Sequence, residues 1–547
     1  MKLATLLTTA LVAFTLQAEA KKNIVGYFPN WLYAKFPVEQ IPYSKYTHLN
    51  YAFAILNKGN EPHFTDDWAV ESQLPKIVKG AHAAGTKVYL SIGGWTGCIK
   101  FSPMVKSAEG RKAFINWNIN FIKKYDTDGV DIDWEYPGRA GAACNIVDPQ
   151  NDTNNFLVLL KELRAALDKE FPSTHKDITM AVRVQPFDGP NGPLKDVSEF
   201  AKVVDLFNIM AYDINGAWAP ITGPLAPFEF ESGKAAPYSY VQGIHDWMAA
   251  GVPASKINAG LPFYGRSIQA TADMTCANQY VSARTGAPKG DSDDAYWQDP
   301  NCSKEPGGLS GIWKWKNLRS EGVLNTPTSA TGNWIRCFDQ KTKTPWLFNK
   351  QTKVYVSYDD PVSLQHKVNY ALCKDLGGVM VWDLSNDYYN GKFELLDVIQ
   401  SIHGNKPGNC DSFPTTIDPG PTVTPTPTDK PTDTSKPPTD TPTPTPTDGP
   451  CSNGQTRCVD EGKKPEYQIC DASKWITMSC PATLVCRGGN GGVYCDYPSK
   501  NAKANLKGKP KKDTPSPQRT TVPQPQEKQK KADRNEQRRI RRMVAGL

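Results

Sequence analysis

Short apolar runs alternate with stretches of helical periodicity between residues 24 and 402. Eight of the runs are rich in β-branched and aromatic residues and are bounded by turn-forming residues, which is typical of buried strands. Between them, apolar residues recur at helical spacing, most clearly over Ala108 to Lys124 and Asn154 to Glu170. The predicted strands are Ile24–Phe28, Thr47–Ile55, Lys87–Ile92, Asp128–Glu135, Ile178–Val184, Val203–Met210, Ile257–Leu261 and Gly378–Trp382.

Strands that alternate with helices favour a parallel sheet, and eight such units over about 380 residues predict a TIM barrel. An open, doubly wound sheet is the alternative, but no glycine-rich loop follows the first strand, which speaks against a dinucleotide site. The stretch from Ser267 to Tyr355 interrupts the alternation between the seventh and eighth strands. It is too long for a plain loop, so we expect a packed insertion there, with most of its tryptophans in a core.

The segments that flank the barrel region (21–405) differ from it in character. Residues 1–20 combine a basic start, an apolar run and a small-residue cleavage site, which predicts a secretory signal. A membrane anchor is the alternative, but the apolar run is too short to span a bilayer comfortably. Residues 411–450 alternate Pro and Thr, which predicts an extended spacer without a core of its own.

Residues 451–498 hold six cysteines, which predicts a small module stapled by disulfides, because so short a chain cannot bury enough core unaided. A zinc site is the alternative, but the segment lacks both histidine and a Cys-x-x-Cys pair. Seven further cysteines precede residue 411, so at least one of them is free or pairs elsewhere. We expect residues 499–547 to be a disordered basic tail. Residues 500–547 alone contribute +11 to a net charge of +7, so the remainder of the chain is acidic.

The predicted fourth strand places acids at every second position, namely Asp131, Asp133 and Glu135. On a strand these side chains share one face, and the apolar residues between them lie on the other. Buried carboxyl groups crowded together raise one another's pKa, which suits a general acid that works near neutrality. A solvated edge strand and a calcium loop are the alternatives, but the flanking residues are apolar and the spacing is not that of a calcium loop.

The motif DGVDIDWEYPG, residues 128–138, resembles the catalytic signature of glycoside hydrolase family 18, the chitinases. Four further motifs are similar to those at the third, sixth, seventh and eighth strands of that family: SIGGW (91–95), NIMAYD (208–213), GLPFYGR (260–266) and GGVMVW (377–382). The resemblance covers residues 24 to 402. It implies that the insertion, at about 267–355, is a small α+β domain that forms one wall of a substrate cleft.

The resemblance also implies a chemistry. Glu135 would be the acid/base, and Tyr212 would hydrogen-bond the acetamido oxygen of the sugar. Asp133 would hold the acetamido N–H and share a proton with Asp131. The sugar's own acetamido group would be the nucleophile, so hydrolysis would retain configuration and need no metal or cofactor. The substrate-binding residues implied by these motifs or by their places near strand ends are Tyr27, Phe53, Gly94, Trp95, Tyr136, Met210, Asp213, Tyr264, Arg266 and Trp382, with Trp31 and Trp218 beside Trp95 in outer subsites.

Two details of the barrel region carry separate expectations. Cys98 follows the third strand and Cys144 follows the fourth, and adjacent loops predict a disulfide between them. Arg183, in the fifth strand, departs from the family resemblance, which leads us to expect a smaller or apolar residue there. For Trp31, plain packing is the alternative to a role in sugar binding.

The six-cysteine module, with DASKW between Cys470 and Cys480, is similar to the chitin-binding module of carbohydrate-binding family 19. Together the resemblances imply a secreted, endo-acting chitinase that cuts β-1,4 bonds of N-acetylglucosamine polymers. Its partners would be chitin and chito-oligosaccharides, with no nucleic acid and no membrane. An endo-N-acetylglucosaminidase acting on N-glycans, a chitinase-like lectin without turnover and a cell-wall structural protein stay open as alternatives. The presence of Glu135 speaks against the lectin.

Overall fold

The computed structural model describes residues 21–413 and parts of a second stretch: 456–461, 463–464, 466–471, 474–479, 485–489 and 492–496. The chain divides near Pro425 into two compact units, and each is described by itself. The predicted signal at residues 1–20, the spacer from residue 414 onward and the basic tail lie outside the described residues, so they stay predictions.

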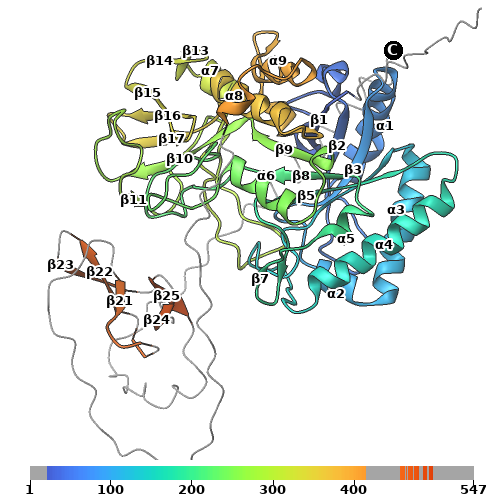
Figure 1. Cartoon of the computed structure of the whole chain (residues 1–547), viewed down its shortest axis with the longest axis horizontal. Coiled ribbons are helices and arrows are strands. Elements are labelled where there is room, and N and C mark those ends of the chain that lie inside the picture. The colour runs from blue at the N-terminus through green and yellow to red at the C-terminus, as the bar shows by residue number, and fades with distance from the viewer. Residues whose placement is uncertain are drawn as a thin grey trace, which may run out of the picture. The chain divides into compact units, whose positions relative to one another are not determined.

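Eight parallel strands of the first unit close into a barrel in the order β1-β18-β9-β8-β5-β4-β3-β2 (Figure 1). Each coincides with a predicted strand to within a few residues, so the predicted TIM barrel is confirmed. Because the strands are parallel, their carboxyl ends all meet at one end of the barrel, which we call the mouth. The barrel strands are β1 (Asn23–Pro29), β2 (His48–Ala54), β3 (Lys87–Gly93), β4 (Gly129–Asp133), β5 (Asp177–Arg183), β8 (Leu206–Met210), β9 (Ile257–Pro262) and β18 (Gly378–Trp382).

Helices α3 (Ala108–Tyr125) and α4 (Asp152–Glu170) confirm the two clearest helical predictions. The side chain of Ser107 caps the first of them by accepting the N–H of Gly110. The apolar stripes of both helices join the outward-facing side chains of β4 in one hydrophobic core. The other helices of the barrel are α1 (Asp67–Ala83), α2 (Phe101–Lys106), α5 (Ser198–Ala201), α6 (Tyr240–Ala249), α8 (Pro361–Cys373) and α9 (Glu394–Ile399), and two small hairpins are formed by β6 (Asp188–Gly189) with β7 (Gly192–Pro193) and by β19 (Tyr388–Tyr389) with β20 (Lys392–Phe393).

Strand β4 is shorter than predicted, because it ends at Asp133 rather than at Glu135. Up to that point the predicted alternation holds, with Val130 and Ile132 in the outer core. Glu135 therefore stands two residues beyond the strand, and the peptide bond that follows it is cis. Trp134 turns outward between the ring of Phe101 (5.2 Å between centroids) and that of Phe156 (5.3 Å), which anchors this bend to the helices.

The insertion between β9 and β18 is built on an antiparallel sheet in the order β11-β10-β17-β16-β15, with β12 paired to β10 (Figure 1). This sheet begins at Tyr264, three residues before the predicted start, because β9 passes into β10 through Phe263 alone. Trp313, Trp315 and Trp346 are buried as expected, whereas Trp297 is half exposed. The elements are β10 (Tyr264–Ala270), β11 (Ala283–Arg284), β12 (Ile312–Lys314), α7 (Trp315–Ser320), β13 (Leu324–Thr326), β14 (Ser329–Ala330), β15 (Trp334–Asp339), β16 (Thr344–Asn349) and β17 (Val354–Ser357).

The predicted disulfide between Cys98 and Cys144 is wrong. Cys144 is bonded to Cys302 of the insertion, and Cys98 is the cysteine of residues 21–413 that has no disulfide partner. The thiol of Cys98 points into the protein, beneath the carboxyl ends of β3 and β4, and so cannot meet a residue of the surface loop. The expectation that the odd group of seven contains an unpaired thiol is confirmed. Two further bonds join Cys276 to Cys337 and Cys373 to Cys410.

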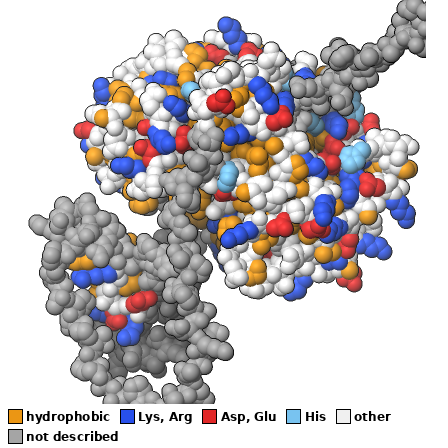
Figure 2. All heavy atoms as spheres, viewed as in Figure 1, with side chains coloured by type: hydrophobic (Ala, Val, Ile, Leu, Met, Phe, Trp, Pro, Cys, Tyr) orange, Lys and Arg blue, Asp and Glu red, His pale blue; other side chains and the backbone are white. Residues whose placement is uncertain are grey.

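The second unit contains one described disulfide, between Cys458 and Cys486. Its described strands are β21 (Thr456–Cys458), β22 (Glu466–Asp471), β23 (Lys474–Ser479), β24 (Val485–Gly489) and β25 (Gly492–Asp496), in one three-stranded and one two-stranded sheet. Among the described residues of both units, no helix is long and apolar enough to cross a membrane. On the face of the first unit seen in Figure 2, positive and negative side chains are interspersed. This mixture agrees with the assignment of the basic excess to the tail.

Candidate active site

Asp131 lies fully buried inside the barrel, surrounded by hydroxyl groups from neighbouring strands. Its Oδ2 accepts hydrogen bonds from Tyr27 Oη (2.9 Å) and Ser91 Oγ (2.7 Å), and its Oδ1 accepts one from Thr179 Oγ1 (2.6 Å). Burial raises the pKa of Asp131, and these hydrogen bonds oppose the rise. These partners from the described part of the chain are uncharged hydroxyls, and Asp131 is the deepest member of the acidic row.

Asp133 is the next member of the row toward the mouth. It is almost completely buried, and within the described residues its Oδ1 has no hydrogen-bond partner. Burial, followed by the negative charges of Glu135 and Asp131, raises its pKa well above the ordinary value. A buried carboxyl without a partner is costly, so Asp133 is prepared for a polar group supplied by a ligand.

Glu135 completes the row at the mouth, where 9% of its surface is exposed. Burial raises its pKa to about 7, the charge of Asp213 adds to the rise, and a hydrogen bond with Tyr136 opposes it. At neutral pH this carboxyl is therefore divided between its two protonation states. Such a group can donate a proton in one step and accept one in the next.

The backbone at Glu135 is held by two residues that the sequence reasoning missed. Cys98 Sγ accepts the N–H of Glu135 (3.3 Å), and its own S–H faces the carbonyl oxygens of Gly94 (3.2 Å) and Asp133 (3.3 Å). On the other side, Asn145 Nδ2 donates to the carbonyl oxygen of Glu135 (2.9 Å). The position of Cys98 just after the glycines of the third strand is a signal for this role, although the adjacency of the two loops predicts a disulfide instead.

Asp213 faces the acidic row from the end of β8 and, unlike that row, is paired. The backbone of Asp213 adopts the left-handed conformation (φ 56°). Arg266 grips its carboxylate with Nε and Nη2, both at 2.6 Å, and Tyr264 Oη donates at 2.8 Å. The neighbouring hydroxyl of Tyr212 contacts Met380 Sδ (3.6 Å). Burial raises the pKa of Tyr212, followed by the charges of Asp133, Asp213 and Glu135, so the hydroxyl stays protonated and can donate.

Aromatic side chains form an apolar patch beside these acids. The ring of Trp382 lies 5.7 Å from that of Tyr27 and 5.6 Å from that of Phe53. Met210 and Tyr212 join the same cluster. Gly94 (φ 77°) allows the patch to close, because a Cβ there would lie 2.7 Å from the ring of Phe53. The patch offers ring faces to the C–H face of a sugar while carboxyl and hydroxyl groups stand at its edge.

Three tryptophans stand farther out and expose about half of their surface: Trp31 (54%), Trp95 (45%) and Trp218 (55%). Trp31 stacks on Phe53 (6.3 Å), which extends the apolar patch outward. Trp218 lies against the guanidinium of Arg266 (5.2 Å). Trp95 donates its Nε1–H to Glu305 Oε1 (3.2 Å). All three lie on the loops that surround the mouth, as predicted, and their exposure disfavours plain packing for Trp31.

Arg183 is the residue that departs from the family resemblance. It ends β5 and, by strand alternation, lies on the same face as Thr179. Its guanidinium pairs with Asp188 (2.9 Å) and donates to Gln185 Oε1 (2.5 Å). Burial lowers the pKa of Arg183, with the charge of Arg139 adding to the effect. The departure is thus accommodated by a local ion pair.

Among the described residues, one group has the spacing of a metal site: His175, Asp177 and Asp205. It lies at the start of β5, at the end of the barrel opposite the mouth. Asp177 already binds Lys87 Nζ (2.5 Å), and Asp205 accepts the N–H of Ile178 (2.8 Å). A cavity of about 580 Å³ at this same end is likewise remote from the acidic row. Both features therefore lie apart from the acidic row at the mouth.

Two family models match the sequence. The model described as glycosyl hydrolases family 18 matches residues 23–387, which include every residue placed in the site above. The model described as carbohydrate binding domain (family 19) matches residues 425–489 and so covers much of the second unit.

Named relatives and a solved structure agree with the first match. A "chitinase-like effector" of Moniliophthora roreri is 36% identical over 393 residues, which is 70% of this chain and 93% of that protein. "Chitinase 1" of Aphanocladium album is 30% identical over 382 residues, covering 66% and 80%. The crystal structure of a chitinase from Rhizomucor miehei superposes with a TM-score of 0.63 at 35% identity, over 70% of this chain and all of that one.

Proposed function

The chain belongs to glycosyl hydrolases family 18, and on this premise we propose that it hydrolyses the β-1,4 bonds of chitin and chito-oligosaccharides. The observation that carries the proposal is the state of Glu135 at the mouth of the barrel. Its carboxyl has a pKa of about 7 and stands next to Asp133, a buried carboxyl with an unused oxygen. One group is set to protonate a leaving oxygen, and the other is set to receive a donor from the substrate.

In this mechanism Glu135 gives its proton to the glycosidic oxygen while the bond between that oxygen and C1 breaks. The acetamido carbonyl oxygen of the same sugar attacks C1 and closes an oxazolinium ring. Asp133 accepts the acetamido N–H and so offsets the positive charge that develops on the ring. Tyr212, which stays protonated, donates to the acetamido oxygen and orients it. Water then gives a proton to Glu135 and adds to C1, which opens the ring and retains the configuration.

The pairing of Asp213 supports the same assignment. Arg266 and Tyr264 hold the negatively charged carboxylate of Asp213 from one side, in a fixed position near Glu135. That charge favours the protonated form of Glu135, which is the form that begins the reaction. The apolar patch around Trp382 then packs against the C–H face of the sugar. In that position C1 of the sugar lies between Glu135 and the sugar's own acetamido group.

We also propose that the protein is secreted and that its second unit binds chitin. The predicted signal and the disulfides of both units favour an oxidising compartment. N-terminal sequencing of the mature protein should begin after residue 20. A truncation after Phe413 keeps the bond between Cys373 and Cys410 and the packing of Phe413 on Phe228. It should lose activity on insoluble chitin but not on soluble oligomers, because binding to the solid raises local concentration.

A chitin-binding protein without turnover is the second candidate, because the relatives from Moniliophthora roreri and Moniliophthora perniciosa are each called a "chitinase-like effector". Release of reducing ends from chito-oligomers by the full-length protein separates the two. The Glu135→Gln variant should abolish release and still bind the oligomers, since the amide keeps the shape of the carboxyl but cannot donate its proton. The matched control is Glu162→Gln, on the outer face of α4, which should lose only its exposed ion pair with Arg111. Absence of reducing ends with the unaltered protein would favour the binder.

A further inference from the structure

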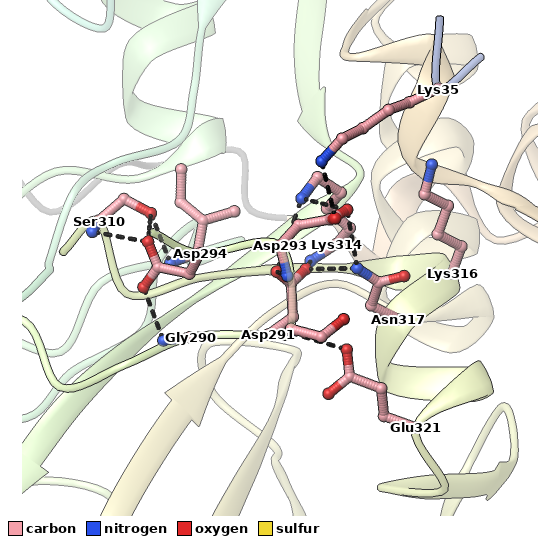
Figure 3. A network of polar contacts seen from close by, with 12 residues as sticks. Lys35, Gly290, Asp291, Asp293, Asp294, Ser310, Lys314, Lys316, Asn317 and Glu321 are labelled. Atoms are coloured by element: carbon pink, nitrogen blue, oxygen red, sulfur yellow. Dashed lines mark hydrogen bonds and ion pairs between the residues drawn. The ribbon is translucent and has the colours of Figure 1, made fainter. Parts of the chain in front are cut away.

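Residues 290–311 leave the insertion and return to it as a closed loop, which we call the strap. At its base, the carboxylate of Asp294 holds the two ends of the loop together. It accepts hydrogen bonds from the N–H groups of Gly290 (2.8 Å), Ser310 (2.9 Å) and Gly311 (3.0 Å) (Figure 3). Midway, Trp297 and Gly308 exchange two backbone hydrogen bonds of 2.9 Å. The strap is therefore a double-stranded arm that is clasped before it reaches its tip.

The tip of the strap is fixed to the barrel by three bonds. Cys302 forms the disulfide with Cys144, on the loop after β4. Glu305 accepts the N–H of Ala143 (2.7 Å) through Oε2 and the indole N–H of Trp95 (3.2 Å) through Oε1. One carboxylate thus connects the strap both to the β4 loop and to an exposed tryptophan on the β3 loop.

The topology of the barrel shows where the strap runs. The insertion departs between β9 and β18, and in the closed ring of eight strands these two stand opposite β3 and β4. Near its base the strap is also tied to the loop after β1, where Lys35 Nζ contacts Asp293 (2.9 Å; Figure 3). The strap therefore leaves the side of the mouth formed by β9 and β18 and ends on the loops of the opposite strands, β3 and β4. The contact with Lys35 adds a tie to the loop after β1, two strands from β3.

The loop that holds the tip through Cys144 lies close to Glu135 in the chain as well as in space. Asn145, next to Cys144, donates to the carbonyl oxygen of Glu135. A Cβ on Gly141 of the same loop would lie 2.0 Å from that oxygen, so this loop packs directly on the Glu135 bend. The strap is thus covalently attached to the segment that supports the proton donor.

Resting on the proposed function, we propose that the strap bridges the sugar path beside Glu135, so that a chitin chain reaches the acid end-first instead of entering from the side. This mode of entry replaces the internal cleavage expected from the family resemblance. A lid that opens in each turnover would allow side entry. The strap is closed by a disulfide at its tip and a carboxylate clasp at its base, so it stays shut while the protein is oxidised.

The test uses the full-length protein with Cys144→Ser and Cys302→Ser combined, which frees the tip without leaving a lone thiol. The matched control replaces the insertion's own disulfide, Cys276→Ser with Cys337→Ser, which lies off the strap. Reducing ends and viscosity are followed together on carboxymethyl chitin, a soluble polymer with bulky substituents. We expect the fall in viscosity per reducing end to rise severalfold in the strap variant and to stay unchanged in the control.

A second variant, Glu305→Ala, keeps the disulfide and frees Trp95, and it should shift the same ratio in the same direction by less. It also serves if the disulfide variant does not fold. An unchanged ratio in a folded, active strap variant would overturn the proposal, and so would an equal rise in the control. Failure of the unaltered protein to release reducing ends from chito-oligomers would instead overturn the proposed function, so the two failures are distinguishable.

Discussion

The protein contains two groups of acids whose members are close together in the sequence, and the two groups have opposite electrostatic surroundings. The carboxyls of Asp131, Asp133 and Glu135 at the end of β4 meet hydroxyls, aromatic rings and one another, and burial raises the pKa of all three. At the base of the strap, Asp293 binds Lys35 and Lys314, and Asp294 receives backbone N–H groups (Figure 3). There the pKa of both carboxyls is lowered, although burial alone would raise it.

The difference teaches that crowding of acids does not by itself make a reactive group. Where cations and N–H donors accompany the carboxyls, the charged form is stable and the group serves as a clasp. Where they are missing, the row costs folding free energy, and burial raises the pKa of its carboxyls. The same substitution, Asp to Asn, should therefore have opposite consequences in the two places.

The largest effect is expected from Asp133→Asn. Loss of the carboxylate that receives the acetamido N–H should lower kcat by about 10²–10³-fold, the usual result of removing one group that stabilises developing charge. Thermal stability should be kept or raised, because the amide replaces a buried carboxyl whose Oδ1 has no hydrogen-bond partner among the described residues. Steady-state rates on chito-oligomers and a melting curve check both parts. If Asp133→Asn lost stability and kept its activity, the acidic row would behave as the strap base is expected to behave, and the contrast between the two groups would be wrong.

The next effect concerns the protonation of Glu135, whose pKa is about 7. Because the reaction begins with the protonated form, kcat/KM should fall about tenfold per pH unit once the pH passes that value. The hydrogen bond with Tyr136 lowers this pKa, so Tyr136→Phe should move the alkaline limb to higher pH. Rate profiles between pH 5 and about 9 on a short oligomer test this point. A limb that moves to lower pH would contradict the assigned cause.

A smaller effect is expected from Asp294→Asn at the base of the strap. An amide retains one acceptor oxygen but cannot serve Gly290, Ser310 and Gly311 together, so the free energy of unfolding should fall by roughly 1–3 kcal/mol. The cost should grow as the pH rises above the lowered pKa of Asp294, since only the unaltered protein then carries the clasping charge. Urea unfolding measures it. Activity on short oligomers should change little, in contrast to Asp133→Asn.

Much of the first group could be predicted from the sequence, because its logic is local. A period of two in a strand fixes the face on which Asp131 and Asp133 lie, and eight apolar runs fix the barrel that directs them to the mouth. The end of the strand could not be predicted in the same way. Glu135 continues the period of two in sequence, and Trp134 packs outward as the period predicts, but the strand pairing ends at Asp133.

The strap could not be predicted, because its bonds join residues that are distant in the chain. Adjacency of loops predicts a bond between Cys144 and Cys98, yet the partner of Cys144 lies 158 residues away. Adjacency of loops gives the approximate distance between two Cα atoms but not the direction of the side chains, and Cys98 points inward. The acids of the strap base carry no period at all, so only the folded chain shows that Asp294 has three N–H groups to bind.

The smallest effect is expected at Cys98, the residue that supports the first group without adding charge to it. Its thiol accepts the N–H of Glu135 and faces the carbonyl oxygen of Asp133. Burial raises the pKa of this thiol, so it stays neutral and positions the bend without changing the pKa of the acid. Cys98→Ser keeps a donor and an acceptor and should retain most activity, whereas Cys98→Ala should lower kcat about three- to tenfold through misplacement of the acid.

A role in positioning is distinguished from a general loss of folding by comparing kcat, which should fall, with KM, which should not change. KM and the alkaline limb of the pH profile should stay where they are in Cys98→Ala, because neither the apolar patch nor the charges around Glu135 are altered. Serine should rescue kcat relative to alanine at equal melting temperature. If the alkaline limb moved in the alanine variant, the thiol would be changing the pKa of Glu135 electrostatically and would not act through the position of the backbone alone.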